Sequence, residues 1–205
     1  TVRHHFQFRE GGSQNPPFLF FLPNNQLPAA VQTEAMQFHR APLLLIGLHI
    51  ASLSPAQTGG SISGARLAAA ASAQIGVTTL YDPAYVALKY PGGDVPLERG
   101  VCCDLVIRAL RKQGIDEDMK ANFAAYPRTW NLKTTDRNID HRRVPNLMKF
   151  FSRKGKSLPV SGNDADYKPG DIVTWMLPGN LPHIGIISAE KVPGTNRPAV
   201  IHNIG

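Results

Sequence analysis

The stretch GVCCDLVIRALRKQG, residues 100–114, has the pattern of an amphipathic helix that begins at two adjacent cysteines, Cys102 and Cys103. Apolar side chains recur along it at helical spacing, whereas Arg108 and the later basic residues are expected to face solvent. Asp104 in the first turn suits the positive end of the helix dipole. The sequence therefore predicts a helix whose first turn carries two thiols.

Three short strands are expected near the end of the chain, and two of them carry a histidine. The segments 171–177 (DIVTWML) and 183–188 (HIGIIS) are rich in β-branched residues, and 199–203 (AVIHN) is shorter. Pro-Gly turn sequences separate the three segments. His183 opens the second strand and His202 lies in the third.

Helices are expected before these strands at residues 65–75, 116–125 and 145–153, in addition to the cysteine helix. Helices first and antiparallel strands last are typical of an α+β domain. We expect the cysteine-bearing helix to pack on the antiparallel sheet.

The first part of the chain has the layout of an export signal. Residues 1–35 lack periodicity and are predicted to be a disordered upstream extension. Within 36–56, a basic residue precedes an apolar stretch, and small residues occupy the positions that a signal peptidase reads. The sequence thus predicts a signal peptide at 36–56 and a domain at 57–205 that is periplasmic or secreted. The processed domain is expected to have no membrane span. Whether this domain is truncated at its C-terminus is left open.

The chain is basic, with a formal net charge of +7 over 205 residues, and much of the excess lies between Arg137 and Lys156. Such a surface suits an anionic partner, here a cell-wall peptide or another anionic envelope polymer. No aromatic stacking platform accompanies the basic run, which argues against nucleic acid. The sequence indicates no cofactor and leaves the oligomeric state open.

The order of a helix-start cysteine followed by two strand-borne histidines is typical of a cysteine hydrolase. A helix N-terminus and an imidazole both favour the thiolate, which is the nucleophilic form of cysteine. His183 is the candidate base. His202, or its neighbour Asn203, is the candidate to hold the His183 ring. The adjacent cysteines cannot form an unstrained disulfide, and Cys103 is an alternative nucleophile.

The segments KPGDIVTWM, PHIGIIS and AVIHNIG, together with the helix-start cysteine, resemble the NlpC-type papain-like fold of bacterial cell-wall peptidases. More closely, residues 65–205, including TTLYDPAYVALKYPGGDVPLERGVCCDLVIRALRKQG, resemble a bacterial exported family known as domain of unknown function 1287. The resemblance implies a catalytic triad of Cys102, His183 and His202. It also implies an oxyanion-assisting tyrosine upstream of the cysteine.

The candidates for that tyrosine are Tyr81, Tyr85 and Tyr90. The resulting prediction is an exported cysteine hydrolase that cleaves an amide bond, in peptidoglycan stem peptides, through a thioester. The alternatives are a non-catalytic envelope-binding module and an acyltransferase or deamidase on the same fold.

A zinc site is a further alternative, because Cys102, Cys103, His183 and His202 are suitable ligand types. Adjacent cysteines chelate zinc poorly, so no metal is predicted. Asp171 is interpreted as a turn residue before a strand, and His141 as a solvent-facing loop residue.

Overall fold

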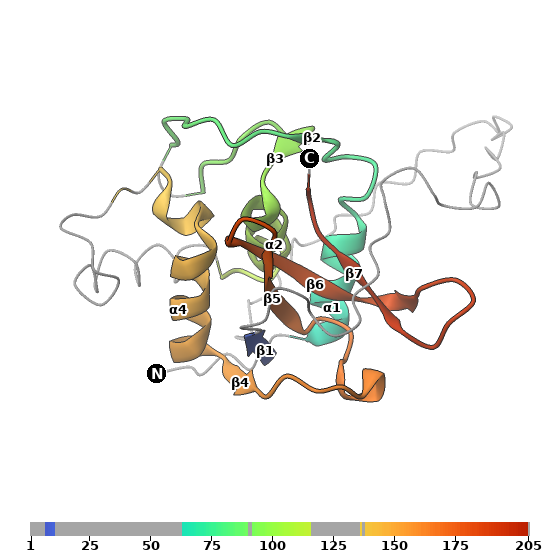
Figure 1. Cartoon of the computed structure of the whole chain (residues 1–205). Coiled ribbons are helices and arrows are strands. Elements are labelled where there is room, and N and C mark those ends of the chain that lie inside the picture. Colours follow the sequence, from blue (N-terminus) through green and yellow to red (C-terminus); the bar gives the residue numbers. More distant parts are fainter. Residues whose placement is uncertain (1–6, 11–62, 90–91, 116–135, 137, 205) are drawn as a thin grey trace, which may run out of the picture.

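The computed structural model describes residues 7–10, 63–89, 92–115, 136 and 138–204. Its main sheet has five strands in the order β4-β1-β5-β6-β7 (Figure 1). The strands are β1 (Gln7–Glu10), β4 (Lys156–Leu158), β5 (Ile172–Leu177), β6 (Leu181–Lys191) and β7 (Pro198–Ile201). β5, β6 and β7 pair antiparallel, whereas β1 runs parallel to both of its neighbours.

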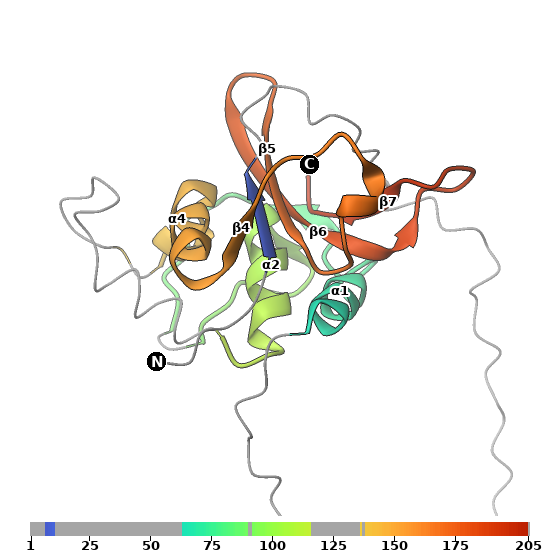
Figure 2. The same ribbon diagram turned by 90° about the horizontal axis from the view of Figure 1, so that it is seen from below.

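Three α-helices contact this sheet: α1 (Gly64–Ser72), α2 (Cys102–Arg111) and α4 (Val144–Lys154). Figure 2 shows them side by side, with α2 between α1 and α4. Side chains alternate between the two faces of the sheet along each strand. Ile184 and Ile186 of β6 pack with the helices, whereas Trp175 of β5 belongs to a second apolar cluster. The structure therefore confirms a mixed α and β fold in which the last three strands, β5, β6 and β7, are antiparallel.

Short strands and 3₁₀ turns lie in the connections that precede α2, α4 and β5. The two-residue strands β2 (Leu80–Tyr81) and β3 (Arg99–Gly100) pair in parallel just before α2. The 3₁₀ turn η3 (Asp140–Arg142) leads into α4, and η4 (Asp164–Asp166) precedes β5. These connections bring residues 80–82, 100–104 and 139–146 to one end of the domain.

The predicted helices at 65–75, 100–114 and 145–153 correspond to α1, α2 and α4. The predicted helix at 116–125 lies outside the described residues. The strand predicted at 183–188 extends to both sides in β6, and the last strand ends at Ile201, so His202 and Asn203 follow β7. Among the described residues, none of the helices has the length and apolarity that a membrane crossing requires.

Residues 7–10 differ from the expectation that residues 1–35 lack regular structure. They form β1, which pairs with β4 on one side and β5 on the other. Four residues are too few for a recognisable strand pattern, so this pairing depends on the two strands that flank it. The other residues of 1–35, and the predicted signal segment 36–56, lie outside the described part of the chain.

Two polar residues predicted to face solvent are buried instead. Arg108 is 7% exposed because its guanidinium pairs with Asp94, with Nε 2.9 Å from Oδ2, and also donates to several backbone carbonyls. His141 is 2% exposed because η3 packs against α2 and α4. Both predictions were wrong because the partners that enclose these side chains are distant in sequence.

Candidate functional site

Cys102 is the first residue of α2, and Val101 is its N-cap. The Asp104 carboxylate accepts the backbone N–H of Val101 at 2.7 Å, which closes the first turn around the cysteine. Arg142 holds the same carboxylate at both oxygens, with its Nε 2.7 Å from Oδ1 and its Nη2 2.8 Å from Oδ2. Asp104 is therefore more than a first-turn charge, because it ties the start of α2 to η3.

His183 and His202 form a hydrogen bond between β6 and the end of β7. Nε2 of His183 lies 3.0 Å from Nδ1 of His202. The Trp175 indole packs edge-on against both rings, with centroid distances of 4.8 Å to His183 and 5.6 Å to His202. This packing restricts the orientation of both imidazoles.

Gly185 permits the close approach of β6 and β7 that this hydrogen bond needs. A Cβ atom at this position would lie 2.8 Å from Cγ1 of Val200, 2.9 Å from the carbonyl oxygen of Ile201 and 3.2 Å from Cβ of His202. Those distances are shorter than ordinary van der Waals contact, so a side chain here would push the end of β7 away from His183.

The Cys102 thiol is acidified by its neighbours. A hydrogen bond from Cys103, together with the hydrogen bond and positive charge of His183, lowers the pKa of Cys102 to about 5 against the opposing effect of burial. The backbone of Ile184 adds a further hydrogen bond. At neutral pH the sulfur is thus held as a thiolate, which is the reactive form.

Cys103 and His202, which also belong to this cluster, stay neutral. Burial, and then the adjacent Cys102, raises the pKa of the Cys103 thiol, which favours its protonated, donating form. Burial, and then the charge of His183, lowers the pKa of His202 to about 3. A neutral His202 can accept at Nδ1 from His183 Nε2–H, so Nδ1 is the His183 nitrogen left available to the Cys102 sulfur.

Asn203 does not contact the His183 ring through a hydrogen bond. Its amide nitrogen donates to the carbonyl oxygen of Gly100 at 2.9 Å, and the side chain is buried. Of the two residues proposed to hold His183, His202 therefore occupies that position. Asn203 instead connects the end of β7 to the backbone that precedes Cys102.

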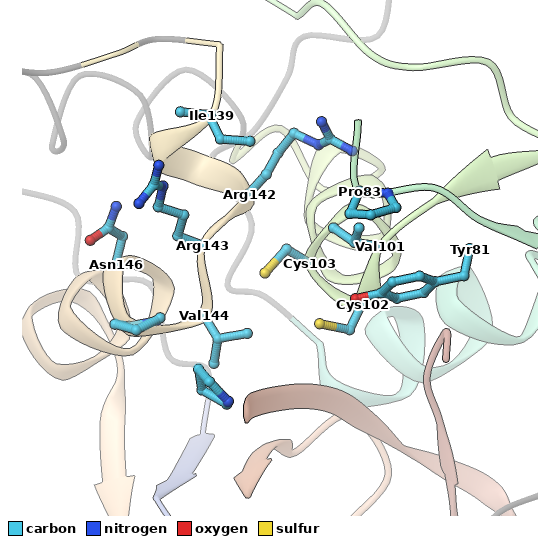
Figure 3. A pocket seen from close by; sticks show the side chains of 12 residues that line it. Tyr81, Pro83, Val101, Cys102, Cys103, Ile139, Arg142, Arg143, Val144 and Asn146 are labelled. Atoms are coloured by element: carbon cyan, nitrogen blue, oxygen red, sulfur yellow. The ribbon is translucent and has the colours of Figure 1, made fainter. Parts of the chain in front are cut away.

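Of the three candidate tyrosines, Tyr81 is the one that lies beside Cys102 in the described part of the chain. Tyr81 lines the same pocket as Cys102, and Figure 3 shows its ring beside that residue. Burial, and then the nearby cysteines, raises the pKa of Tyr81, so its phenol remains a donor at neutral pH. Tyr85 instead bonds with Asp136 and Asn138, at 3.0 and 2.8 Å. Tyr90 lies outside the described residues.

A pocket of about 410 Å³ opens over the two cysteines. Tyr81, Pro83 and the start of α2 form one wall, and Ile139 with residues 142–146 forms the other (Figure 3). Pro182, next to His183, closes part of it. A reacting group in this pocket would thus meet the activated thiol of Cys102.

Some functional candidates were missed by sequence analysis. Arg142 was counted only as part of the basic run between Arg137 and Lys156, and Trp175 only as a residue of the strand expected at 171–177. Asp171 is confirmed as a turn residue, because its carboxylate accepts the backbone N–H of Lys168 at 3.0 Å. Within the described residues, no cluster of three or more His, Cys, Asp or Glu side chains is placed to hold a metal ion.

Fold and site together define a mixed α and β domain with a helix-start cysteine hydrogen-bonded to one of two paired histidines. Residues 68–205 match the family described as "Domain of unknown function (DUF1287)", and the chain belongs to this family. Over 145 residues it is 57% identical to "Uncharacterized protein YijF" of Escherichia coli (strain K12), across 68% of this chain and 70% of that relative. No solved structure matches the chain.

Proposed function

We propose that this protein is a cysteine hydrolase that cleaves an amide bond. The proposal is carried by one observation: Cys102, His183 and His202 form a continuous hydrogen-bonded series at the start of a helix. Cys102 is the proposed nucleophile, His183 the acid and base, and His202 the residue that orients His183. The acidic pKa of Cys102, against the raised pKa of Cys103, favours Cys102 as the attacking thiol.

In the proposed first step, the Cys102 thiolate attacks the carbonyl carbon of the amide and forms a C–S bond. The electron pair of the carbonyl moves to oxygen, where unpaired N–H groups at the start of α2 and the Tyr81 hydroxyl are the available donors. The imidazolium of His183 then gives its Nδ1 proton to the amide nitrogen. The C–N bond breaks, the amine leaves, and a thioester on Cys102 remains.

In the second step, neutral His183 removes a proton from water as the water oxygen attacks the thioester carbon. The C–S bond breaks and releases a carboxylic acid together with the Cys102 thiolate, which regenerates the starting ion pair. His202 contributes by accepting the Nε2–H of His183 throughout, so the ring does not rotate away from the sulfur.

The proposed setting is the cell envelope. The layout of residues 36–56 supports export, and the order of helix-start cysteine, strand histidine and following polar residue supports a papain-like, NlpC-related fold. The basic excess of the chain supports an anionic polymer as the partner. We propose peptidoglycan stem peptides as the substrate class on these grounds.

The test is digestion of purified cell-wall sacculi, with soluble products identified by mass spectrometry. Peptide release by the unmodified protein that is lost in Cys102→Ala supports the proposal and identifies the bond. Cys103→Ala is the matched control, because it changes the adjacent buried thiol. If peptide release is lost only in Cys103→Ala, Cys103 is the nucleophile instead of Cys102. If the unmodified protein releases no peptide, the proposal of wall hydrolysis is overturned.

A further inference from the structure

A second pocket, of about 450 Å³, lies toward the other end of β6 from the cysteine site. Pro182, at the start of β6, lines the Cys102 pocket, whereas residues 188–191 of the same strand line the second one. Its other walls come from η4 with its flanking residues and from the turn between β6 and β7. At a rise of about 3.4 Å per residue, His183 and Ser188 are about 17 Å apart along β6, so the two pockets are separate.

The charges around this second pocket are nearly balanced. Its lining includes two lysines, Lys168 and Lys191, and two acids, Asp164 and Glu190. Arg197 pairs with Asp164, with Nε 3.7 Å from Oδ2. Lys168, Lys191 and Glu190 are exposed, so an ion pair between one of them and a charged ligand would add little affinity. The pocket therefore favours a neutral polar ligand over an anion or a cation.

Ser188 supplies a buried hydroxyl to the wall of this pocket. Its side chain is 4% exposed, and its Oγ accepts the backbone N–H of Glu190 at 3.0 Å. Within the described residues, no acceptor is placed for the proton of this hydroxyl. Because a buried donor without an acceptor is costly, an oxygen atom of a ligand would be stabilised here.

Two exposed side chains next to Ser188 add further hydrogen-bonding groups. The carboxylate of Glu190 has no partner among the described residues and can accept from a ligand. The amide oxygen of Asn196 accepts from Nζ of Lys191 at 3.4 Å, which leaves its two N–H groups as donors. The pocket thus offers both donors and acceptors to one ligand.

The ring of Tyr167 gives the same pocket an apolar wall. It packs against the second apolar cluster, which contains Trp175, and its hydroxyl donates to the carbonyl oxygen of Ser161 at 2.9 Å. These contacts hold the ring in place. Pro169 and Pro198 add apolar surface to the lining. An apolar wall with a few convergent polar groups is the usual composition of a small-ligand site.

We propose that this pocket binds a neutral saccharide. The C–H face of a sugar ring packs on Tyr167, the sugar hydroxyls donate to Glu190, and the sugar oxygens accept from Ser188 and Asn196. The inference goes beyond the proposed function, because it uses none of the residues that surround Cys102. It holds whether or not the protein is a hydrolase.

The test is titration of the isotope-labelled protein with two uncharged oligosaccharides, cellotetraose and chitotetraose, followed through backbone amide chemical shifts. We expect saturable shifts with at least one of them, confined to residues 163–169 and 188–198, and none at residues 101–104. Cellotetraose carries only hydroxyls and chitotetraose carries acetamido groups as well, so the stronger response identifies the kind of saccharide. Saturable shifts with neither oligosaccharide would overturn the inference.

Two variants of the pocket connect the binding to its residues. Ser188→Ala and Glu190→Ala should each raise Kd about two- to tenfold, which is the effect of one lost hydrogen bond. Glu190 is exposed, so Glu190→Ala leaves the core intact if Ser188→Ala does not fold. The matched controls are Ser152→Ala and Glu98→Ala, which lie outside the pocket and should keep the unmodified Kd.

A Kd that changes in neither pocket variant, or equally in the controls, would overturn the assignment. Tighter binding of inorganic phosphate or of an acidic tetrapeptide at the same amides would overturn it as well, since the ligand would then be charged. Peptide release from sacculi is a separate readout. Its absence would contradict wall hydrolysis and leave the saccharide site supported, whereas absence of saccharide binding with normal peptide release would remove the saccharide site alone.

Discussion

Nε2 of His183 lies 3.0 Å from Nδ1 of His202, and the Trp175 ring packs against both imidazoles. This contact joins β6 to the residue that follows β7. It fixes which nitrogen of His183 is free for Cys102, since the other one is occupied. The hydrogen bond therefore determines the orientation of the proposed base.

His202→Phe should lower kcat for peptide release by at least about tenfold, because the ring still packs on Trp175 but no acceptor holds His183. His202→Asn should retain more activity, because its amide oxygen can accept the same proton. The measurement is kcat and KM on soluble wall peptides, with KM expected to change little. Equal activity in the Phe and Asn variants would contradict an orienting role for His202.

The lowered pKa of Cys102 predicts the pH dependence of its alkylation. Because the thiolate predominates above a pKa of about 5, the rate with iodoacetamide should rise between about pH 4 and about pH 6 and then stay level. Cys103→Ala removes the hydrogen bond that lowers this pKa most, so its midpoint should move to higher pH.

Cys103→Ser is the matched control for that experiment, because its hydroxyl can still donate to the Cys102 sulfur. Its midpoint should lie between those of the unmodified protein and Cys103→Ala. A midpoint near ~8.5 in the unmodified protein, the value of an unperturbed cysteine, would show that Cys102 is not activated.

The sequence predicted the elements that carry the site better than the contacts between them. Apolar spacing located α2 and α4 within a few residues, and β-branched composition located β5 and β6, because these signals are local. Choosing between His202 and Asn203, or between Tyr81 and Tyr85, depends on where a strand ends and a loop folds back.

The same reason explains the errors. Arg108 and His141 have polar side chains that local patterning places in solvent, yet Asp94 and the packing of η3 enclose them. The Asp104–Arg142 pair joins residues 38 positions apart, and no spacing rule indicates such a contact. Buried charge networks are thus the part of this fold that the sequence alone does not indicate.

Two tyrosine variants separate catalysis from packing. Tyr81→Phe should reduce kcat about tenfold or more, because it removes a hydroxyl donor from the pocket beside Cys102. Tyr85→Phe should leave kcat unchanged, since its hydroxyl bonds with Asp136 and Asn138 instead. Steady-state kinetics on wall peptides provide the comparison, and an equal loss in both variants would exclude a specific role for Tyr81.

The placement of β1 can be tested against the proposed export signal. Cleavage after residue 56 would remove β1, which lies between β4 and β5. If the domain is 57–205, that fragment should unfold cooperatively in urea with a midpoint close to that of the whole chain. Loss of cooperative unfolding in the fragment would show that β1 is an integral strand and would contradict removal of residues 1–56.

The ion pair between Asp104 and Arg142 should be a major source of stability at the start of α2. Both side chains are almost fully buried, and the carboxylate also accepts the Val101 N–H. Arg142→Met would leave a buried carboxylate without its counter-charge, so we expect a loss of about 3–5 kcal/mol in the free energy of unfolding. Arg143→Met, at the exposed neighbouring position, should cost less than about 0.5 kcal/mol.

The double variant Asp104→Asn/Arg142→Met separates loss of the pair from loss of shape. Its asparagine oxygen can still accept the Val101 N–H, and no charge is left buried, so it should be more stable than Arg142→Met alone. Urea unfolding with an unchanged m-value measures each difference. Strictly additive losses in the free energy of unfolding would mean that the two side chains do not interact. The contact between the start of α2 and η3 would then depend on packing alone.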